Sequence, residues 1–203
     1  MLWIGITGVM GSGKTTVSRR LEELGYPVEY ADRVARDVVA PGTNGLDQVQ
    51  QAFGPDVLAE DGSLDRAALG KIVFASEEKL RELEGILHPL IHERVTTFRA
   101  EAEAQGADFA FYDIPLLFEK GLMSRFDVIV CVIAERDELF KRLAKREGWS
   151  REEVESRLQH QVSQDEKMRG SQYVLDNSDD FEALFEQIES MLDSLSTSPI
   201  LNS

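Results

Sequence analysis

Residues Gly8–Thr15 read G-V-M-G-S-G-K-T and match the phosphate-loop pattern G-x-x-x-x-G-K-[ST]. The preceding segment, Leu2–Thr7, is an apolar run typical of a strand, and the following segment, Thr16–Leu24, carries apolar residues at helical spacing. A strand, a glycine-rich turn and a helix in this order are the context that the motif requires. The sequence therefore predicts a strand–loop–helix unit that binds a nucleoside triphosphate.

Length and charge narrow the class of protein. With 203 residues the chain can form one domain with a sizeable core. Its formal charge of −15, from 22 basic and 37 acidic side chains, argues against a nucleic-acid partner, because nucleic acids need a basic surface. No apolar run has the length of a membrane span and no signal-peptide pattern opens the chain, so we expect a cytoplasmic protein without a membrane partner. Cys131 lies in an apolar run and is expected to be a buried strand thiol.

Short apolar runs separated by helical segments predict the α/β class with a parallel sheet. The predicted strands are Leu2–Thr7, Pro27–Tyr30, Ala110–Leu117, Val128–Ala134 and Tyr173–Leu175. A last helix is expected from about Asp179 to Leu195, and the polar tail Ser196–Ser203 is expected to fray. The core of this single domain would then comprise residues of about 1–32, 107–135 and 168–196.

A first insertion, residues of about 33–106, contains no convincing strand. We expect a turn at Asp61-Gly62 and a helix from about Ser76, which Pro89 would either break or kink. A long helical insertion beside a phosphate loop suggests a subdomain for the second substrate.

A second insertion, residues of about 136–167, is rich in charged side chains. Ser150 and Glu153 form a capping-box pattern at the start of a helix, and Gly148 stands just before it. The pattern predicts two helices joined at a glycine, which close over the nucleotide as a lid.

The phosphate loop supplies the first candidate site residues. Gly8, Gly11 and Gly13 allow backbone N–H groups to approach the phosphate oxygens closely. Lys14 would reach the β- and γ-phosphates, and the hydroxyl of Thr15 is the expected magnesium ligand.

Asp32 follows the predicted strand Pro27–Tyr30, at the sheet edge where ligands bind in open parallel sheets. Its carboxylate would accept a proton from an attacking hydroxyl or bind the water shell of a metal ion. Alternatively, it caps a helix that starts at Arg33. The residues favour neither interpretation, and the two are compatible.

Asp113 lies in an apolar run and resembles the acidic residue that supports magnesium in many phosphate-loop enzymes. A buried carboxylate needs a partner, so the alternative is a structural hydrogen bond to a neighbouring loop.

Arg142 and Arg146 are four residues apart and share a helical face. They would bind phosphate oxygens, or else belong to a solvated face; a basic cluster in so acidic a chain favours the first interpretation. His88 and His92 share the same spacing, but they lack the intervening glutamate of a zinc-protease helix, and we reject a zinc site. His88 is better explained as a substrate contact or as a residue at a helix start.

Taken together, these motifs resemble the dephospho-coenzyme A kinase family over nearly the whole chain. The family opens with a strand and a phosphate loop like Ile6–Thr16, followed by an Asp-Ala-Asp segment. Here Tyr30 replaces the first aspartate of that segment, and Asp32, the position of the family's base, is kept. The further matching segments are Arg36, Pro41-Gly42, Gly62-Ser63-Leu64-Asp65-Arg66, Leu87-His88-Pro89-Leu90-Ile91, Pro115-Leu116-Leu117-Phe118-Glu119, Lys141-Arg142 through Arg146, and Tyr173-Val174-Leu175-Asp176-Asn177.

The resemblance implies a P-loop kinase fold: three α/β/α layers with a five-stranded parallel sheet, a helical substrate-binding subdomain and a helical lid. It implies ATP-dependent phosphorylation of the ribose 3′-hydroxyl of dephospho-coenzyme A, the last step of coenzyme A biosynthesis. The implied catalytic residues are Asp32, Lys14 and Arg142. The implied ATP-binding residues are Gly11, Ser12, Gly13, Lys14, Thr15, Thr16, Arg146 and Asn177, with Mg²⁺ on Thr15 and Asp113. The implied acceptor-binding residues are Asp32, Arg66, His88, Pro115, Leu116 and Glu119.

Two rival functions are a kinase for nucleoside monophosphates or another small metabolite, and a GTPase-like switch. The switch would require a guanine-reading Asn-Lys-x-Asp segment, which the sequence lacks. The oligomeric state is left open, with a monomer favoured over a trimer.

Overall fold

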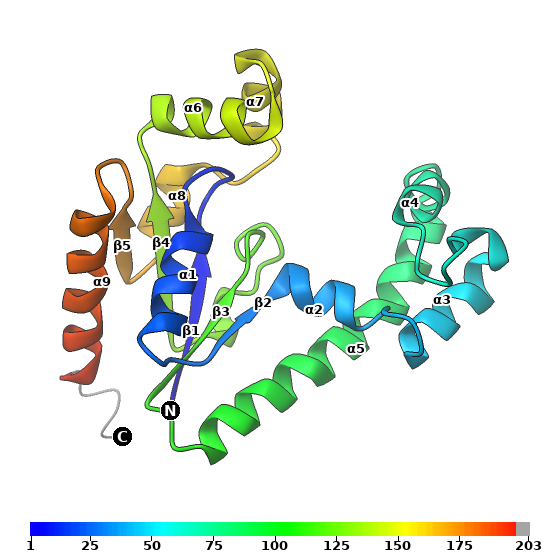
Figure 1. The fold of residues 1–203 in the computed structure, drawn as a ribbon, viewed down its shortest axis with the longest axis horizontal. Helices are drawn as coiled ribbons and strands as arrows, with labels where there is room; N and C mark the ends of the chain where they lie inside the picture. The colour runs from blue at the N-terminus through cyan, green and yellow to red at the C-terminus, as the bar shows by residue number, and fades with distance from the viewer. Residues whose placement is uncertain (198–203) are drawn as a thin grey trace. The chain divides into compact units, whose positions relative to one another are not determined.

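The computed structural model describes residues 1–197 and contains a five-stranded parallel sheet in the order β2-β3-β1-β4-β5 (Figure 1). The strands are β1 Leu2–Thr7, β2 Val28–Tyr30, β3 Phe109–Asp113, β4 Val128–Ile133 and β5 Tyr173–Asp176. In the central strand β1, Ile4 pairs with Phe111 of β3 on one side and with Val128 of β4 on the other. The phosphate loop follows β1, and it therefore lies at the middle of the carboxyl edge of the sheet, where ligands bind in this class. The predicted fold class is confirmed.

The structure corrects the predicted strand Ala110–Leu117, because β3 ends at Asp113. Pro115 has no N–H to donate to a strand ladder, so the chain leaves the sheet after Ile114 N donates to Ile6 O at 2.9 Å. Leu117 instead packs over Gly5, where an added Cβ would lie 2.7 Å from the Leu117 side chain.

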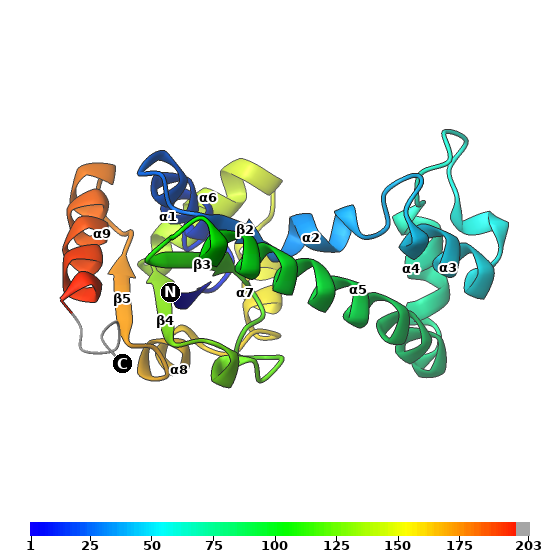
Figure 2. The ribbon, with the colours of Figure 1, turned by 90° about the horizontal axis from the view of Figure 1, so that it is seen from below.

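Helices lie on both faces of the sheet in the first of two compact units, which comprises residues 1–30 and the described residues from 102 onward. The helices of this unit are α1 Lys14–Glu23, η2 Met123–Arg125, α6 Arg136–Glu147, α7 Arg151–Leu158, α8 Gln164–Arg169 and α9 Phe181–Ser196. α1 and α9 bury Leu21, Leu184 and Ile188 against one face in the main core. Figures 1 and 2 both place α8 beside β4, on the other face. Residues 198–203 of the tail that we expected to fray lie outside the described part of the chain.

The lid helices follow the sequence prediction closely. α6 ends at Gly148, which adopts a left-handed conformation with φ 73°. Ser150 caps α7 and forms the complete capping box with Glu153. A second capping box, of Ser163 with Glu166, starts α8 and was not predicted.

Residues 31–101 form the second compact unit. Its helices are α2 Ala31–Asp37, α3 Asn44–Phe53, η1 Pro55–Val57, α4 Arg66–Phe74 and most of α5 Glu77–Ala104. A small core of its own contains Val39, Val49, Val57, Leu69 and Val73.

Pro89 does not break the helix in which it lies, so that alternative is wrong. α5 runs continuously through the proline. Proline removes one backbone hydrogen bond, but Leu83, Ile86 and Leu87 in the turns before it pack against the core of this unit and hold the helix in place. No helix among residues 1–197 is long and apolar enough to cross a bilayer.

Candidate active site

The phosphate loop forms the turn between β1 and α1. Gly11 and Gly13 have φ angles of 78° and 95°, in the left-handed region that favours glycine. Gly13 is the N-cap of α1 and provides no side-chain cap, so the first N–H groups of the helix remain available to an anion. The ammonium of Lys14 donates to Gly8 O at 2.9 Å and to Val9 O at 3.4 Å, which holds its positive charge over the loop.

The loop and the lid helix α6 together line a cavity of about 190 Å³. Its lining includes the loop residues Gly11, Gly13, Lys14, Thr15 and Thr16, and the lid residues Arg142 and Arg146. The structure thus brings together two segments that the sequence separates by more than a hundred residues. Arg142 is half-buried, whereas Arg146 is exposed and pairs with Glu147 at 2.7 Å.

Two buried polar atoms, one in the phosphate loop and one in α6, point to a ligand. Within the described residues, Ser12 Oγ and Arg142 Nη1 have no hydrogen-bond partner although both are buried. Buried polar groups in folded proteins are nearly always paired, and a phosphate oxygen would accept a hydrogen bond from either atom.

Asn177 supports both halves of the cavity. Its side-chain Nδ2 donates to the backbone oxygen of Ser12 at 2.8 Å. Its backbone carbonyl oxygen accepts from Arg142 Nη2 at 2.6 Å. An added Cβ on Gly13 would lie 1.9 Å from Asn177 Nδ2, so close packing as well as the backbone angle requires glycine there. In this structure the amide nitrogen of Asn177 contacts the loop backbone.

Asp113 and Thr15 are the candidate metal ligands. Asp113 is buried, and its Oδ2 accepts from Ser18 Oγ at 2.9 Å, while Thr15 is exposed at the start of α1. Asp113 therefore makes a structural hydrogen bond, but its partner lies in the helix α1 and not in a neighbouring loop as we expected. Its role as a metal ligand stays a prediction. A hydroxyl and a carboxylate suit Mg²⁺, which prefers oxygen ligands and needs few of them from the protein when phosphates are bound.

Asp32 is exposed and lies in the first turn of α2. The prediction that it caps a helix starting at Arg33 is wrong, because α2 begins at Ala31, directly after β2. Tyr30, at the position of the family's first aspartate, donates from its hydroxyl to Glu22 of α1 at 2.8 Å. The side chain of Tyr30 is therefore hydrogen-bonded to another residue of the first compact unit.

The loop after β3 contains three expected acceptor-binding residues in different environments. Leu116 is 43 % exposed, and Pro115 and Glu119 are half-buried. Glu119 Oε2 accepts from Lys167 Nζ at 2.9 Å, and its Oε1 accepts from Val162 N at 2.9 Å. Glu119 therefore ties this loop to the segment before and within α8.

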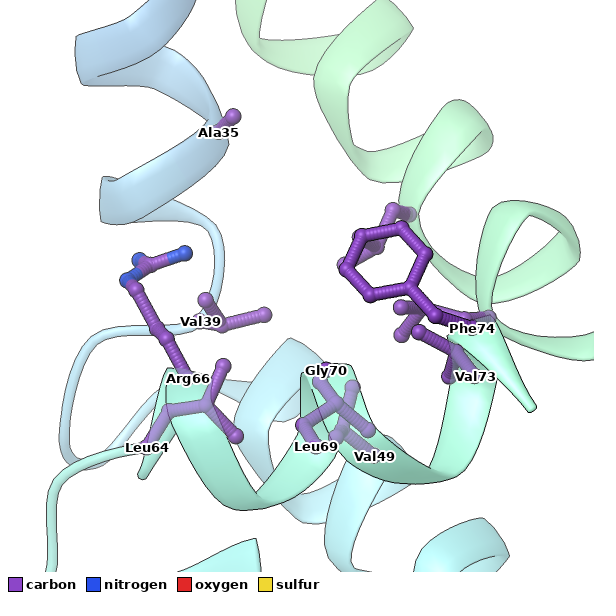
Figure 3. Close-up of a pocket in the computed structure, with 11 residues that line it drawn as sticks. Ala35, Val39, Val49, Leu64, Arg66, Leu69, Gly70, Val73 and Phe74 are labelled. Atoms are coloured by element: carbon purple, nitrogen blue, oxygen red, sulfur yellow. The ribbon is translucent and has the colours of Figure 1, made fainter. Parts of the chain in front are cut away.

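The second unit contains a separate pocket of about 180 Å³ in which Arg66 is the charged lining residue (Figure 3). Figure 3 shows Arg66 and Phe74 at opposite ends of α4, on either side of the pocket. Phe74 is 83 % exposed, and the lining between the two is apolar, including Val39 and Leu69. His88 is exposed and is not among the lining residues. It lies inside α5, so the prediction that it stands at a helix start is wrong.

Cys131 is fully buried in β4, as predicted. Burial raises the pKa of its thiol from 9.0 to about 11, although Lys167 and Lys14 nearby act in the opposite direction. A thiol with so high a pKa is a poor nucleophile at neutral pH.

Sequence reasoning missed three residues with roles at this site: Ser18, Gln161 and Lys167. Ser18 is the partner of Asp113, and Gln161 Oε1 accepts from Met10 N in the phosphate loop at 3.0 Å. Lys167 is completely buried, which is rare for a lysine. The Ser163–Glu166 capping box was the available signal, because it predicts a further helix that carries Lys167.

A parallel five-stranded sheet with a phosphate loop after its central strand, and a helix, α6, that brings two arginines to the loop, defines a P-loop kinase. A sequence profile of dephospho-CoA kinase matches residues 2–182. Dephospho-CoA kinases from Carboxydothermus hydrogenoformans and Bdellovibrio bacteriovorus are 43 % and 42 % identical to this chain. The alignments cover 93 % and 95 % of this chain, and 92 % and 95 % of the two relatives. The chain belongs to the dephospho-CoA kinase family.

Solved structures agree with the fold. A crystal structure from Thermus thermophilus, 36 % identical, has a TM-score of 0.79 and covers 96 % of this chain, with 97 % of its own length matched. Dephospho-CoA kinase from Campylobacter jejuni is 23 % identical, with a TM-score of 0.72 and 96 % of each chain covered, and supports the fold alone.

Proposed function

We propose that this kinase transfers the γ-phosphoryl group of ATP to the ribose 3′-hydroxyl of dephospho-coenzyme A, the final step of coenzyme A biosynthesis. The observation that carries the proposal is the cavity in which Lys14 and Arg142 meet at the phosphate loop, in a chain whose family is dephospho-CoA kinase. The two cations are suited to the charge on a transferred phosphoryl group.

On the donor side, the N–H groups of residues 11–16 bind the phosphates of ATP, with Ser12 and Thr16 in the loop. When ATP binds, the ammonium of Lys14 moves away from the carbonyl oxygens of Gly8 and Val9 and pairs with the β- and γ-phosphates. Arg142 donates from Nη1, the atom without a partner among the described residues, to the transferred group. Arg146 and Asn177 complete the nucleotide site, the latter by holding Ser12 and Arg142 in place.

Thr15 and Asp113 are the residues that would hold Mg²⁺, which neutralises charge on the β- and γ-phosphates when bound. Ser18 orients the Asp113 carboxylate through its 2.9 Å hydrogen bond.

On the acceptor side, Asp32 orients the 3′-hydroxyl and accepts its proton; its exposure at the start of α2 leaves the carboxylate accessible. Arg66, His88, Pro115, Leu116 and Glu119 contribute to binding of dephospho-coenzyme A. The pocket beside Arg66 suits part of this molecule, because an apolar lining with one guanidinium matches a ligand that has both apolar and phosphate groups.

Asp32→Asn tests the assignment of the base. Asparagine keeps the size of the side chain but cannot accept the proton, so we expect kcat to fall by about 10²- to 10⁴-fold with ATP affinity unchanged. Steady-state kinetics with dephospho-coenzyme A, together with calorimetric titration of ATP, would measure both quantities.

Asp37→Asn is the matched control, since Asp37 is an exposed aspartate in the same helix. Near-normal turnover by Asp32→Asn would remove Asp32 from the mechanism. Purified protein that phosphorylates a nucleoside monophosphate faster than dephospho-coenzyme A would instead refute the proposed acceptor.

A further inference from the structure

A short segment, residues 161–167, connects the parts of the first unit that surround the nucleotide site. It begins after α7 and ends within α8, which lies beside β4 in both views (Figures 1 and 2). Its side chains and backbone bond to three separate segments, and we refer to residues 161–167 as the brace.

The first connection of the brace is to the phosphate loop. Gln161 Oε1 accepts from Met10 N at 3.0 Å, across 151 positions of the sequence. Met10 lies within the loop whose N–H groups bind phosphates, so this bond fixes how the loop backbone is turned.

The second connection is to the end of β4. The side chain of Gln164 accepts from Ala134 N at 3.2 Å and donates to Ala134 O, also at 3.2 Å. This pair of bonds holds the brace to the carboxyl edge of the sheet.

The third connection is to the loop Pro115–Glu119. Lys167 Nζ donates to Glu119 Oε2 at 2.9 Å and to Pro115 O at 3.3 Å, and Val162 N donates to Glu119 Oε1 at 2.9 Å. The ammonium also lies 5.5 Å from the centre of the Phe118 ring.

The burial of Lys167 is costly and needs a reason. Its side chain has no exposed surface, and that of Glu119 is 15 % exposed. A buried ion pair is seldom more stable than apolar residues of the same volume, whereas its directional bonds fix one arrangement of the groups it joins. The ion pair of Lys167 and Glu119 joins two segments. One is the brace, which is bonded to the phosphate loop, and the other is the loop Pro115–Glu119, which we propose contacts the acceptor.

We propose that the brace positions the phosphate loop and the Pro115–Glu119 loop relative to each other, with Gln161 and Lys167 as its positioning residues. Gln161 acts on the donor side through Met10, and Lys167 acts on the acceptor side through Glu119 and Pro115. The proposal rests on the proposed function, because it assigns Pro115–Glu119 to the acceptor.

The test compares the Michaelis constants of two variants. Gln161→Leu removes the acceptor for Met10 N, and we expect the KM for ATP to rise about tenfold while the KM for dephospho-coenzyme A changes less than about twofold. Lys167→Met should do the reverse, raising the KM for dephospho-coenzyme A by about tenfold or more and leaving that for ATP nearly unchanged. Gln159→Leu and Arg169→Met are matched controls, since both residues are exposed neighbours and should leave both constants unchanged.

Lys167→Met leaves Glu119 without its cation and could unfold the protein, so a second variant keeps the test decisive. Lys167→Met combined with Glu119→Gln removes both charges and should restore the melting temperature. Its KM for dephospho-coenzyme A should exceed that of Glu119→Gln alone, which accounts for any direct contact between Glu119 and the acceptor. Changes in melting temperature with both KM values unaltered would show that the brace is merely structural and overturn the proposal. Equal increases in both KM values for either single variant would also overturn it.

The wild-type protein in the same assay separates this proposal from the proposed function. Absence of turnover with dephospho-coenzyme A in the wild type would refute the function. In that case calorimetry with ATP still tests the donor side: weaker binding by Gln161→Leu supports the role of Gln161, and unchanged binding refutes it.

Discussion

At the scale of single residues, Cys131 shows how burial beside the active site changes chemistry. It pairs with Thr7, the last residue of β1 before the phosphate loop, and its pKa is raised to about 11 because it is buried. The neighbouring ammonium groups of Lys14 and Lys167 do not outweigh the loss of solvent. The thiol therefore packs as a small apolar group.

The raised pKa predicts a loss of stability at alkaline pH. Between pH 9 and 11 the unfolded chain releases the Cys131 proton that the folded chain keeps, so the free energy of unfolding falls as the pH rises. We expect this residue to cost about 1 kcal/mol at pH 10 relative to pH 7. Urea denaturation at pH 7 and at pH 10 gives the change in the free energy of unfolding for the wild type and for Cys131→Ala. Subtracting one change from the other cancels the contribution of all other titrating groups and leaves that of Cys131. An identical pH dependence in the two proteins would contradict the raised pKa.

At the scale of elements, α9 illustrates a pattern that local sequence predicted almost completely. Leu184, Ile188 and Leu192 follow one another at intervals of four residues, which puts them on one face of the helix, and they are buried against the sheet. Phe181 shares this face but is 62 % exposed, because it is the first residue of the helix after the N-cap Asp180. It stacks on Phe185 at 6.3 Å between ring centres instead of entering the core.

Leu184→Ala should therefore destabilise the protein strongly. Leu184 is completely buried, and removing its side chain leaves a cavity between α9 and the sheet that costs about 3 kcal/mol. Glu186→Ala, an exposed position of the same helix, should change stability by less than about 0.5 kcal/mol. Denaturant unfolding monitored by circular dichroism would show this contrast, and equal effects of the two substitutions would argue against the packing of α9.

At the scale of the whole molecule, the chain is divided into two units, each with its own core and its own cavity. The cavity of about 190 Å³ in the first unit is lined by the phosphate loop and two arginines, and the pocket of about 180 Å³ in the second is mainly apolar. The different linings suit an ATP polyphosphate and part of a mixed polar and apolar acceptor.

This division predicts that the two substrates protect different segments from hydrogen exchange. An unreactive ATP analogue with Mg²⁺ should slow exchange in residues 8–16 and 136–147, because binding stabilises the segments that it contacts. Dephospho-coenzyme A alone should slow exchange in α4, Arg66–Phe74, and leave residues 8–16 little changed. Mass spectrometry of the exchanged peptides would distinguish the two patterns, and an unaffected α4 would exclude the pocket beside Arg66 as part of the acceptor site.

The amino-acid sequence by itself determined the alternation of strands and helices, the phosphate loop and the lid helices with their capping box. These features depend on apolar spacing and on interactions between residues a few positions apart, which a sequence displays directly. The same local reasoning placed the end of β3 too late and allowed a break at Pro89, because neither the exit of a strand from its sheet nor the packing of a helix is a local property.

Only the tertiary structure decided which distant groups meet. Gln161 reaches Met10, Lys167 reaches Glu119 and Ser18 reaches Asp113 because the order β2-β3-β1-β4-β5 places their segments side by side. Local patterns show that strands exist but not which strands are neighbours. The polar contacts at the carboxyl edge of the sheet follow from that order.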